Sequence, residues 1–380
     1  LLYLLEYPFL FRLKRSKIRL FFNGSSGIER MRLMQRHMIS IPLWILPSTG
    51  ILSYTIRMKK LETPPSGSLG KILDTETIVA ETSRVRIDME RFRGAKFYED
   101  SDIDADLHQC EELKSKFNEE QEKYTGDKRA QYERGVAAEY TFRHAIEKYG
   151  WLAENVNVIV TSEYDDFVRG IDSIAQIIMG PDRFEHLGFA IDFTTGSDDV
   201  GNKIRRTFDA LDQGFTPSVK YFDSPKTGKL KNFKVPRIVV GAGPETMERL
   251  ATFSAEIMNN SAMSESAHEE IRADAFRAVL FGQIEAQLSV FVNRLKKVIE
   301  QAKREGRPEI LQRAEQSLAT HIQALKVTQD LAEEANITMA DIAKQVRGDQ
   351  FTAKMGQALS ALSMTPIQFK EKKPFNPAMK

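Results

Sequence analysis

Residues 188–194 read Gly-Phe-Ala-Ile-Asp-Phe-Thr, a β-rich run bounded by turn residues, and this run decides the fold prediction. Such a pattern predicts a short strand inside a sheet. Because alternate residues of a strand share a face, Asp192 points away from the side of Ile191 and Phe193. A carboxylate in so apolar a strand needs a cation, a proton or a metal ion beside it. We therefore expect Asp192 to have a functional partner.

Helices and strands alternate around this run. The pattern predicts a helix over 129–149 that stops at Gly150, strands over 156–161, 168–178 and 188–194, a helix from 197 to about 213, and strands over 218–222 and 237–240. The order α-β-β-β-α-β-β predicts an α/β domain. Before this domain, residues 77–79 form a short strand-like piece, and residues 101–127 are strongly charged and helical in part.

Beyond Pro244 the pattern is helical. Seven apolar residues recur at intervals of three and four from Phe276 to Val298, which predicts a long helix with one buried stripe. Arg307-Pro308 breaks this pattern, and residues 310–335 predict a second helix. We expect a helical hairpin that packs on the α/β domain or joins two copies of the chain in a homodimer.

The chain divides into five parts by composition. These are a basic and apolar leader (1–61), a linker with a charged helical lead-in (62–127), the α/β domain (128–243), a helical extension (244–363) and a loose tail (364–380). Residues 1–60 contain eleven Lys and Arg and two Asp and Glu, so the +1 of the whole chain leaves the remainder at net −8. Net charge therefore does not predict a nucleic-acid partner. We expect the leader to be an over-extended gene start, with a signal or anchor segment as the alternative.

Location, membrane contact and nucleotide binding are also constrained by composition. The single cysteine, Cys110, excludes an internal disulfide and favours a cytoplasmic location. Residues 39–56 are too short and too interrupted by Pro, Ser and Gly for a membrane helix, so no membrane partner is expected. Residues 240–246 resemble a dinucleotide loop, but Thr246 stands at the third glycine position, and no nucleotide cofactor is expected.

Three carboxylates stand out by their predicted positions. Glu139 lies in the first helix of the α/β domain, Asp172 in its second strand and Asp192 in its third. Two strand acids that meet at neighbouring positions, with a helix acid beside them, supply the hard oxygen ligands that Mg²⁺ or Mn²⁺ requires. A metal ion there would activate water and stabilise charge on a phosphate.

At these residues the chain resembles the core of the PD-(D/E)xK nuclease-like proteins. The resemblance is carried by Gly-Ile-Asp-Ser-Ile at 170–174, by Ala-Ile-Asp-Phe-Thr at 190–194 and by the preceding helix with Glu139, and it covers about residues 129–242. It implies a restriction-endonuclease-like α-β-β-β-α-β core with a mixed central sheet. It also implies that Asp172 and Asp192 bind Mg²⁺ or Mn²⁺, with Glu139 as an auxiliary ligand or water-orienting base.

The chain departs from this family at the motif lysine. Thr194 occupies that position and cannot supply the positive charge. Within the superfamily the lysine sometimes migrates, and the candidates here are Lys203 in the following helix and Lys220 in the next strand. Lys203 is preferred because a helix packed across the sheet reaches the same cleft. The alternative is that Lys203 only pairs with Asp199, one turn earlier.

The acids have ordinary structural interpretations as well. Asp172 follows a glycine and suits a strand start, and Glu139 suits a solvated helix position paired with Arg143. Three further acids are expected to decorate the turn before the second strand, and one of them is a further candidate for the site: Glu163, Asp165 and Asp166. The basic run from Lys226 to Lys234 is expected to be a solvated loop, with a track for a phosphate backbone as the alternative.

The sequence thus leads to two hypotheses. The first is a metal-dependent nuclease that hydrolyses DNA, with RNA as a second substrate class, through Glu139, Asp172, Asp192 and Lys203. The second is a non-catalytic protein of the same fold that binds nucleic acid or a protein partner and assembles through its C-terminal helices.

Overall fold

A computed structural model describes residues 75–177, 187–194, 199–225, 227–258 and 265–369. The predicted leader and the linker over 62–70 lie outside the described residues, as does most of the predicted tail. Predictions for those segments stay open.

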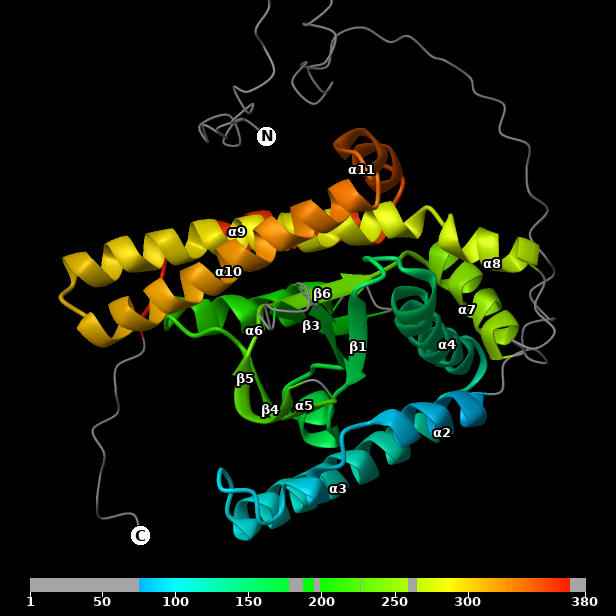
Figure 1. The fold of residues 1–380 in the computed structure, drawn as a ribbon, viewed down its shortest axis with the longest axis horizontal. Helices are drawn as coiled ribbons and strands as arrows, with labels where there is room; N and C mark the ends of the chain where they lie inside the picture. The colour runs from blue at the N-terminus through cyan, green and yellow to red at the C-terminus, as the bar shows by residue number, and fades with distance from the viewer. Residues whose placement is uncertain (1–74, 178–186, 195–198, 226, 259–264, 370–380) are drawn as a thin grey trace, which may run out of the picture. The chain divides into compact units, whose positions relative to one another are not determined.

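The centre of the protein is a mixed four-stranded sheet (Figure 1). Its strands are β1 (Val156–Val160), β2 (Ser173–Ile177), β3 (Leu187–Thr194) and β6 (Arg237–Gly241), in the order β1-β2-β3-β6. The first three strands are antiparallel neighbours, and β6 pairs with β3 in parallel. The predicted mixed α/β class with C-terminal helices is therefore confirmed.

The parallel pair requires a long crossover, because a tight turn joins only antiparallel strands. The crossover contains α6 (Val200–Asp212) and an antiparallel hairpin of β4 (Ser218–Ser224) and β5 (Gly228–Lys234). The solvated loop expected at 226–234 is wrong, because its described residues form β5. Val219 and Phe222 of β4 pack in an apolar cluster with the sheet, and the residues paired with them in β5, Phe233 and Leu230, are partly buried against the same cluster. The three lysines of β5 conceal this pattern in the sequence.

The two faces of the sheet have different covers. One face packs on α4 (Gly126–Tyr149), where the rings of Phe142 and Phe193 lie 5.3 Å apart, and α7 (Pro244–Met258) packs on α4. Gly150 ends α4 as expected, with a φ of 62° that favours glycine. The other face carries Ala190, which packs in an apolar cluster with Phe222 of the β4–β5 hairpin.

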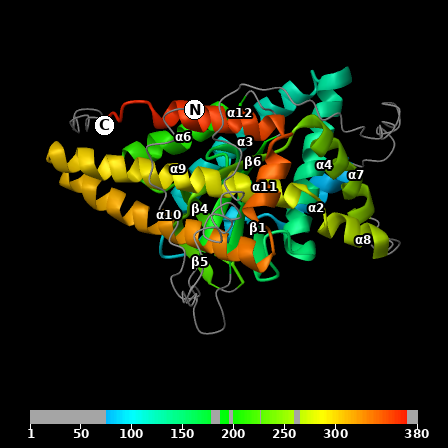
Figure 2. The same cartoon turned by 90° about the horizontal axis from the view of Figure 1, so that it is seen from above.

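The long helical hairpin lies along the β6 edge of the sheet. It consists of α9 (Phe276–Arg304) and α10 (Pro308–Glu334), which lie side by side in Figures 1 and 2. Gln283 and Gln287 of α9 each donate to and accept from the backbone of β6, at Gly241 and Val239 respectively, with distances of 2.8–3.2 Å. These side-chain amides take the place of a further strand, because they form hydrogen bonds with the backbone N–H and C=O groups on the outer edge of β6. The predicted hairpin packed on the α/β domain is confirmed.

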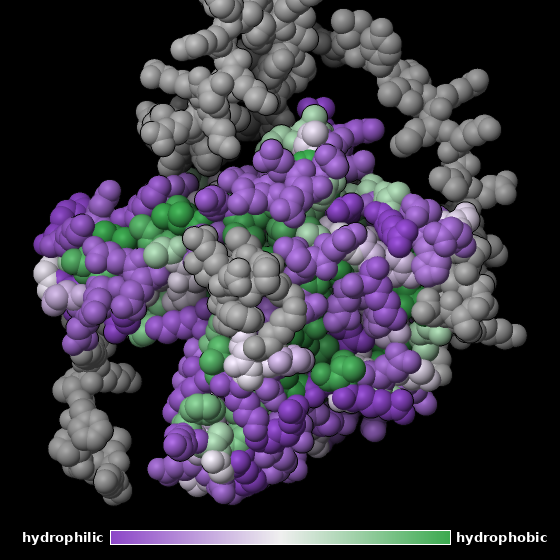
Figure 3. Space-filling view, in the orientation of Figure 1, coloured by the Kyte–Doolittle hydropathy of each residue, from purple (hydrophilic) through white to green (hydrophobic). Residues whose placement is uncertain are grey.

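Burial of α9 also explains its apolar composition. The helical stretch Glu265–Arg304, which contains α8 (Glu265–Arg272), is long and apolar enough to cross a membrane by length and composition alone. Its most apolar window is 61% buried inside the protein, as in the core helix of a folded domain. The outer surface of the α9–α10 hairpin is mostly hydrophilic, with a narrow apolar strip between the two helices (Figure 3).

Shorter helices complete the fold. They are α2 (Thr75–Val85), the 3₁₀ turn η4 (Met89–Phe92), α3 (Asp100–Gln121), α5 (Glu163–Phe167), α11 (Met339–Val346) and α12 (Gln350–Ser363). The strand-like piece expected at 77–79 is wrong, because it lies within α2, which buries Ile78 against the core. Tertiary packing here overrides a local preference for strand.

The second predicted strand, over 168–178, is wrong in its first half. Ser162 caps α5 by accepting a hydrogen bond from the Asp165 amide, and Gly170 then turns the chain with a φ of 64°. The strand begins only at Ser173, so Asp172 lies one residue before β2 rather than within it.

Candidate active site

The four predicted site residues come together from α4, β3, α6 and the loop that precedes β2. Asp192 of β3 is only 1% exposed, and Asp172 lies beside it because Ser173 pairs with Ile191. Burial raises the pKa of Asp172 well above its usual range, and the negative charges of Glu139 and Asp192 add to that rise while Lys203 opposes it. The fold therefore brings all four charged groups into one neighbourhood.

Asp192 is held between two cations. The ammonium of Lys203 lies 2.5 Å from Oδ1, and the guanidinium of Arg237 donates to Oδ2. Lys203 also donates to the carbonyl of Phe193 at 3.4 Å. The alternative pairing of Lys203 with Asp199 is not what the described residues show: the amide of Lys203 donates to the Asp199 carbonyl, and its side chain reaches the sheet. The preferred lysine thus occupies the expected place.

Arg237 was missed as a site residue. It opens β6, is buried, and its Nε has no hydrogen-bond partner in the described part of the chain. Its guanidinium approaches Gly170 so closely that a Cβ there would lie 2.8 Å from Nη2 and 3.6 Å from the Arg206 guanidinium. The signal in the sequence was the arginine that begins the apolar run Arg-Ile-Val-Val, because an arginine buried in such a strand requires an acid as its partner.

Asp172 accepts a hydrogen bond from the amide of Phe193, 2.6 Å from Oδ2. The charge of Asp166 contributes to the raised pKa of Asp172, so the two carboxyls lie in the same cluster. Burial raises the pKa of Asp166, while the ion pair with Arg86, at 2.8 Å, acts against that rise. Of the three turn acids, Asp166 is therefore the one that joins the site.

Glu139 contributes an acid with no hydrogen bond or ion pair to any described residue. Burial raises the pKa of this half-buried carboxyl to about 7, the charge of Asp166 adds to the rise, and Arg86 and Arg143 oppose it. The pair expected with Arg143 is not formed, since the Arg143 guanidinium donates to Thr82 at 3.4 Å. Glu139 is thus able to exchange a proton near neutral pH.

Arg86 gave no signal in the sequence. It follows α2, about eighty residues before Asp166, and it also donates to the carbonyl of Ser162 at 3.4 Å. Only the packing of the α2–α3 segment on the sheet places it at the carboxylates. Together, four acids face three bases at this site: Glu139, Asp166, Asp172 and Asp192 against Arg86, Lys203 and Arg237.

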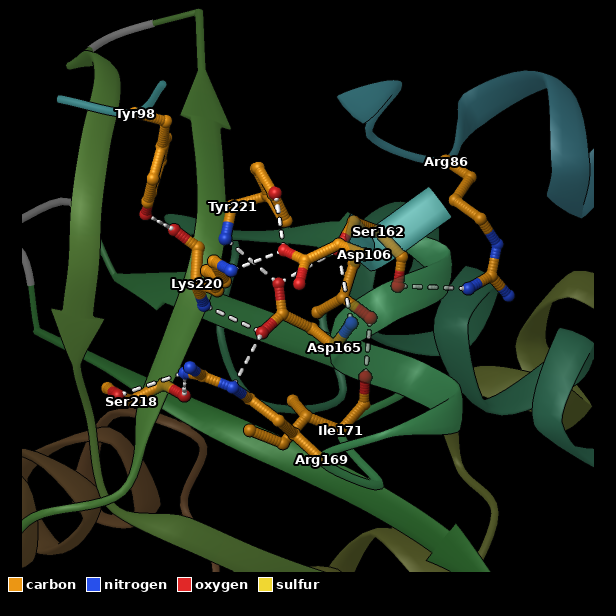
Figure 4. A network of polar contacts seen from close by, with 11 residues as sticks. Arg86, Tyr98, Asp106, Ser162, Asp165, Arg169, Ile171, Ser218, Lys220 and Tyr221 are labelled. Atoms are coloured by element: carbon orange, nitrogen blue, oxygen red, sulfur yellow. Dashed lines mark hydrogen bonds and ion pairs between the residues drawn. The ribbon is translucent and has the colours of Figure 1, made fainter. Parts of the chain in front are cut away.

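Lys220, the second candidate lysine, lies elsewhere. Its ammonium binds the carboxylate of Asp106 from α3, which also accepts from the Tyr221 hydroxyl at 2.6 Å (Figure 4). The ring of Tyr164 lies 4.8 Å from the ammonium. Lys220 therefore holds α3 on β4 and does not serve the Asp192 cluster.

The site contains the carboxylate oxygens that a divalent cation binds, but these side chains are not arranged around an ion. Carboxylate oxygens are the ligands of Mg²⁺ and Mn²⁺, and protonated or mutually repelling acids gain from a nearby cation. Within the described ranges, however, no three acidic, histidine or cysteine side chains are placed so that they could hold an ion. Both oxygens of Asp192 are bound to Lys203 and Arg237. Binding of an ion by Asp192 would require one of these cations to release its oxygen.

The glycine loop at 240–246 is filled by the protein itself. The Gly243 amide donates to Asp349 at 3.2 Å, and a Cβ at Gly241 would lie 2.5 Å from the ring of Phe351. Both partners belong to the start of α12. Packing between β6 and α12 accounts for the glycines of this loop.

Comparison with models of known protein families, with curated proteins and with solved structures gives no match for this chain. The functional argument therefore depends on the order of the elements and on the geometry of the carboxylate cluster.

Proposed function

We propose that this protein is a metal-dependent nuclease of the PD-(D/E)xK type that hydrolyses phosphodiester bonds in DNA. The observation that carries the proposal is the Lys203 ammonium on the buried carboxylate of Asp192, beside Asp172, which immediately precedes the neighbouring strand β2. Two acids at adjacent strands with a lysine at the second acid resemble the charge arrangement of that family, with the lysine supplied by α6 in place of Thr194.

The order of the elements supports the proposal. α4, β1, β2, β3, α6 and β6 follow the α-β-β-β-α-β order, and β6 is parallel to β3. The short helix α5 and the β4–β5 hairpin are additions to that order. Charged groups from α4, β3 and α6 therefore meet at one place on the sheet.

Each residue has a distinct role in the proposed reaction. Asp172, Asp192 and Glu139 would hold Mg²⁺ or Mn²⁺, which when bound supplies activation of water and neutralisation of phosphate charge. Lys203 offers an ammonium that binds a phosphate oxygen or orients water at the reacting phosphorus. Glu139 is either a ligand of the ion or, where it does not bind the ion, the base that accepts a proton from water, since burial raises its pKa to about 7. Arg237 positions Asp192.

The experiment is a cleavage assay on the full chain. Labelled single- and double-stranded DNA and RNA are incubated with Mg²⁺, with Mn²⁺ and with EDTA. We expect metal-dependent cleavage that falls about 10²-fold or more in Asp192→Asn and in Lys203→Met. Asp199→Asn is the matched control, because this exposed acid lies one turn from Lys203 and outside the cluster. Cleavage that persists in EDTA or is unchanged in Asp192→Asn contradicts the proposal.

A second function is favoured by the closed ion pairs of Asp192. With both oxygens bound to Lys203 and Arg237, the same fold would serve as a non-catalytic module that binds nucleic acid or a protein and assembles through its C-terminal helices. Binding of labelled DNA without cleavage in any metal, together with a dimer in solution by light scattering, would favour this alternative.

A further inference from the structure

A small pocket opens beyond the end of α6, between α10 and the end of β5. Its lining includes an aromatic residue, two cations and three hydroxyls: Phe215, Lys234, Arg313, Thr216, Ser317 and Thr320. No acidic residue is among the described residues that line it. A concave, polar site with two uncompensated cations attracts an anion.

The cations of the pocket are placed for a ligand rather than for internal pairing. The guanidinium of Arg313 lies 4.3 Å from the ring centre of Phe215, and its Nε donates to the carbonyl of Gln213 at 3.3 Å. The described residues give neither Arg313 nor Lys234 an ion pair. The hydrogen bond to Gln213 uses only the Nε of Arg313, and a guanidinium has further N–H groups that suit bidentate contact with a phosphate.

The hydroxyls are oriented by one another. Thr216 donates to the Ser317 hydroxyl at 2.8 Å, and both residues are buried. Because Ser317 accepts this bond, its own hydrogen remains to donate. The third hydroxyl, on Thr320, donates back to the carbonyl of Gln316. The lining of the pocket thus offers a hydroxyl donor in addition to the two cations.

Of the described lysines in the basic run that ends at Lys234, only Lys234 lines the pocket and is a candidate to bind an anion there. Lys229 donates to the carbonyl of Arg91 and Lys231 to the carbonyl of Phe97, so both hold the segment after α2 on the hairpin. Lys234 is at the other end of β5, pairs across the hairpin with Ser218 only through the backbone, and lines the pocket. Its position is explained by the pocket and not by that docking.

Phe215 indicates the chemistry of the rest of the ligand. Phe215 is 45% exposed although it lies in a loop between two core elements. An exposed ring beside phosphate-binding cations is the arrangement with which proteins stack the bases of single strands. Lys203 lies nine residues before Asp212, the last residue of α6, or about 14 Å at the rise of a helix, and Phe215 follows three residues later. A strand that lies in the cluster can extend over this distance.

We propose that the pocket binds a backbone phosphate of a single-stranded nucleic acid, with the neighbouring base stacked on Phe215. Arg313 and Lys234 contact the phosphate, and the Ser317 hydroxyl donates to it. The inference rests on the proposed function in one respect, the path of the nucleic-acid strand from the Asp192 cluster along α6. Binding of a phosphate in the pocket does not require that the protein cleaves the strand.

The test is fluorescence anisotropy of the full chain with a labelled twelve-nucleotide oligo(dT) in EDTA, so that no cleavage occurs. We expect Kd to rise about tenfold in Arg313→Ala and in Lys234→Ala, with the salt dependence of log Kd reduced by about one unit in each. We expect Phe215→Ala to weaken the single strand about tenfold and a duplex of the same length much less. Lys326→Ala, an exposed lysine on the same helix, is the matched control and leaves Kd unchanged.

The outcomes separate this inference from the nuclease proposal. Loss of affinity in Arg313→Ala and Lys234→Ala supports the pocket even when the wild type cleaves nothing. Cleavage by the wild type with equal affinity in all variants overturns the pocket and leaves the nuclease proposal intact. If inorganic phosphate binds the wild type in calorimetry but the variants bind oligo(dT) as the wild type does, the pocket is an anion site only and the inference fails. Absence of oligo(dT) binding by a folded wild type overturns it as well.

Discussion

Asp165 and Asp166 are neighbours in α5 and have opposite surroundings. Asp165 accepts from the amides of Lys220 and Tyr221 at 2.6 and 3.0 Å and from the Ser162 hydroxyl at 2.9 Å (Figure 4). Asp166 points the other way, to Arg86 and to the carboxyl of Asp172. Two adjacent acids of the same short helix therefore belong to two different polar networks.

The difference separates a structural acid from a candidate functional one. Burial raises the pKa of Asp165, but backbone amides and Arg169 favour its charged form, so its network is complete without a ligand. The network of Asp166 holds four acids whose charges oppose one another. Proteins maintain such unfavourable charge where a ligand or a reaction uses it. The contrast can be tested by stability measurements in four ways.

The largest effect is expected for Asp165→Ala. The substitution leaves two buried backbone amides and the Ser162 hydroxyl without an acceptor, so we expect a loss of about 3–5 kcal/mol in the free energy of unfolding. Urea unfolding measures it, with Asp166→Ala as the matched neighbour, for which we expect less than about 1 kcal/mol. Equal losses in the two variants would remove the distinction between the networks.

Gly170→Ala is expected to have the next largest effect. The residue has a φ of 64°, and an added Cβ would lie 2.8 Å from the Arg237 guanidinium. We expect a loss of about 2–3 kcal/mol, from backbone strain and from displacement of Arg237 out of its pair with Asp192. Gly94→Ala controls for backbone strain alone, since its φ is 66° and nothing lies within 4 Å of an added Cβ. Equal destabilisation of both variants would show that Arg237 tolerates the methyl group.

Divalent cations should stabilise the wild type by binding in the network of Asp166 and not in that of Asp165. With millimolar Mn²⁺ at pH 8 we expect a gain of about 2 kcal/mol, because the ion replaces protons on the opposed acids. At pH 5 a larger fraction of those acids is protonated and the ion must displace more protons, so the gain should nearly vanish. Differential scanning calorimetry with and without Mn²⁺ measures it. Asp172→Asn should abolish the gain, and a gain that persists in this variant places the ion elsewhere.

Glu139→Gln should show the smallest effect, and one that depends on pH. The folded pKa of about 7 lies above the usual value of 4.5, so folding binds a proton in that range and wild-type stability falls as pH rises from about 4.5 to 7. Relative to the wild type, Glu139→Gln should gain about 1 kcal/mol above pH 7 and nothing below pH 4, after allowance for solvent screening of a half-buried group. Thermal unfolding from pH 4 to 8 measures the difference, and a gain independent of pH would contradict the raised pKa.

Sequence patterns predicted the regular elements better than their boundaries. The period of the α9 stripe and the run at 188–194 were sufficient for a long helix and a central strand, because both patterns result from burial of one face. The start of β2 and the helix at 163–167 were missed because the helix is only five residues long and depends on a serine cap and on the turn at Gly170, which leave no periodic pattern. β5 was missed because a hairpin strand with one exposed face has little apolar signal.

The amino-acid sequence by itself determined that Asp192 sits in an apolar strand and that a helix with Lys203 follows it, since neighbouring residues fix both facts. Only the tertiary structure decided which charges meet there. Arg86, Asp166 and Arg237 come from segments separated by about seventy to eighty residues, and each reaches the cluster through the packing of its element on the sheet. The physical reason is that a buried charge is stabilised by partners close in space, and Arg237 beside Asp192 and Arg86 beside Asp166 are distant from them along the chain.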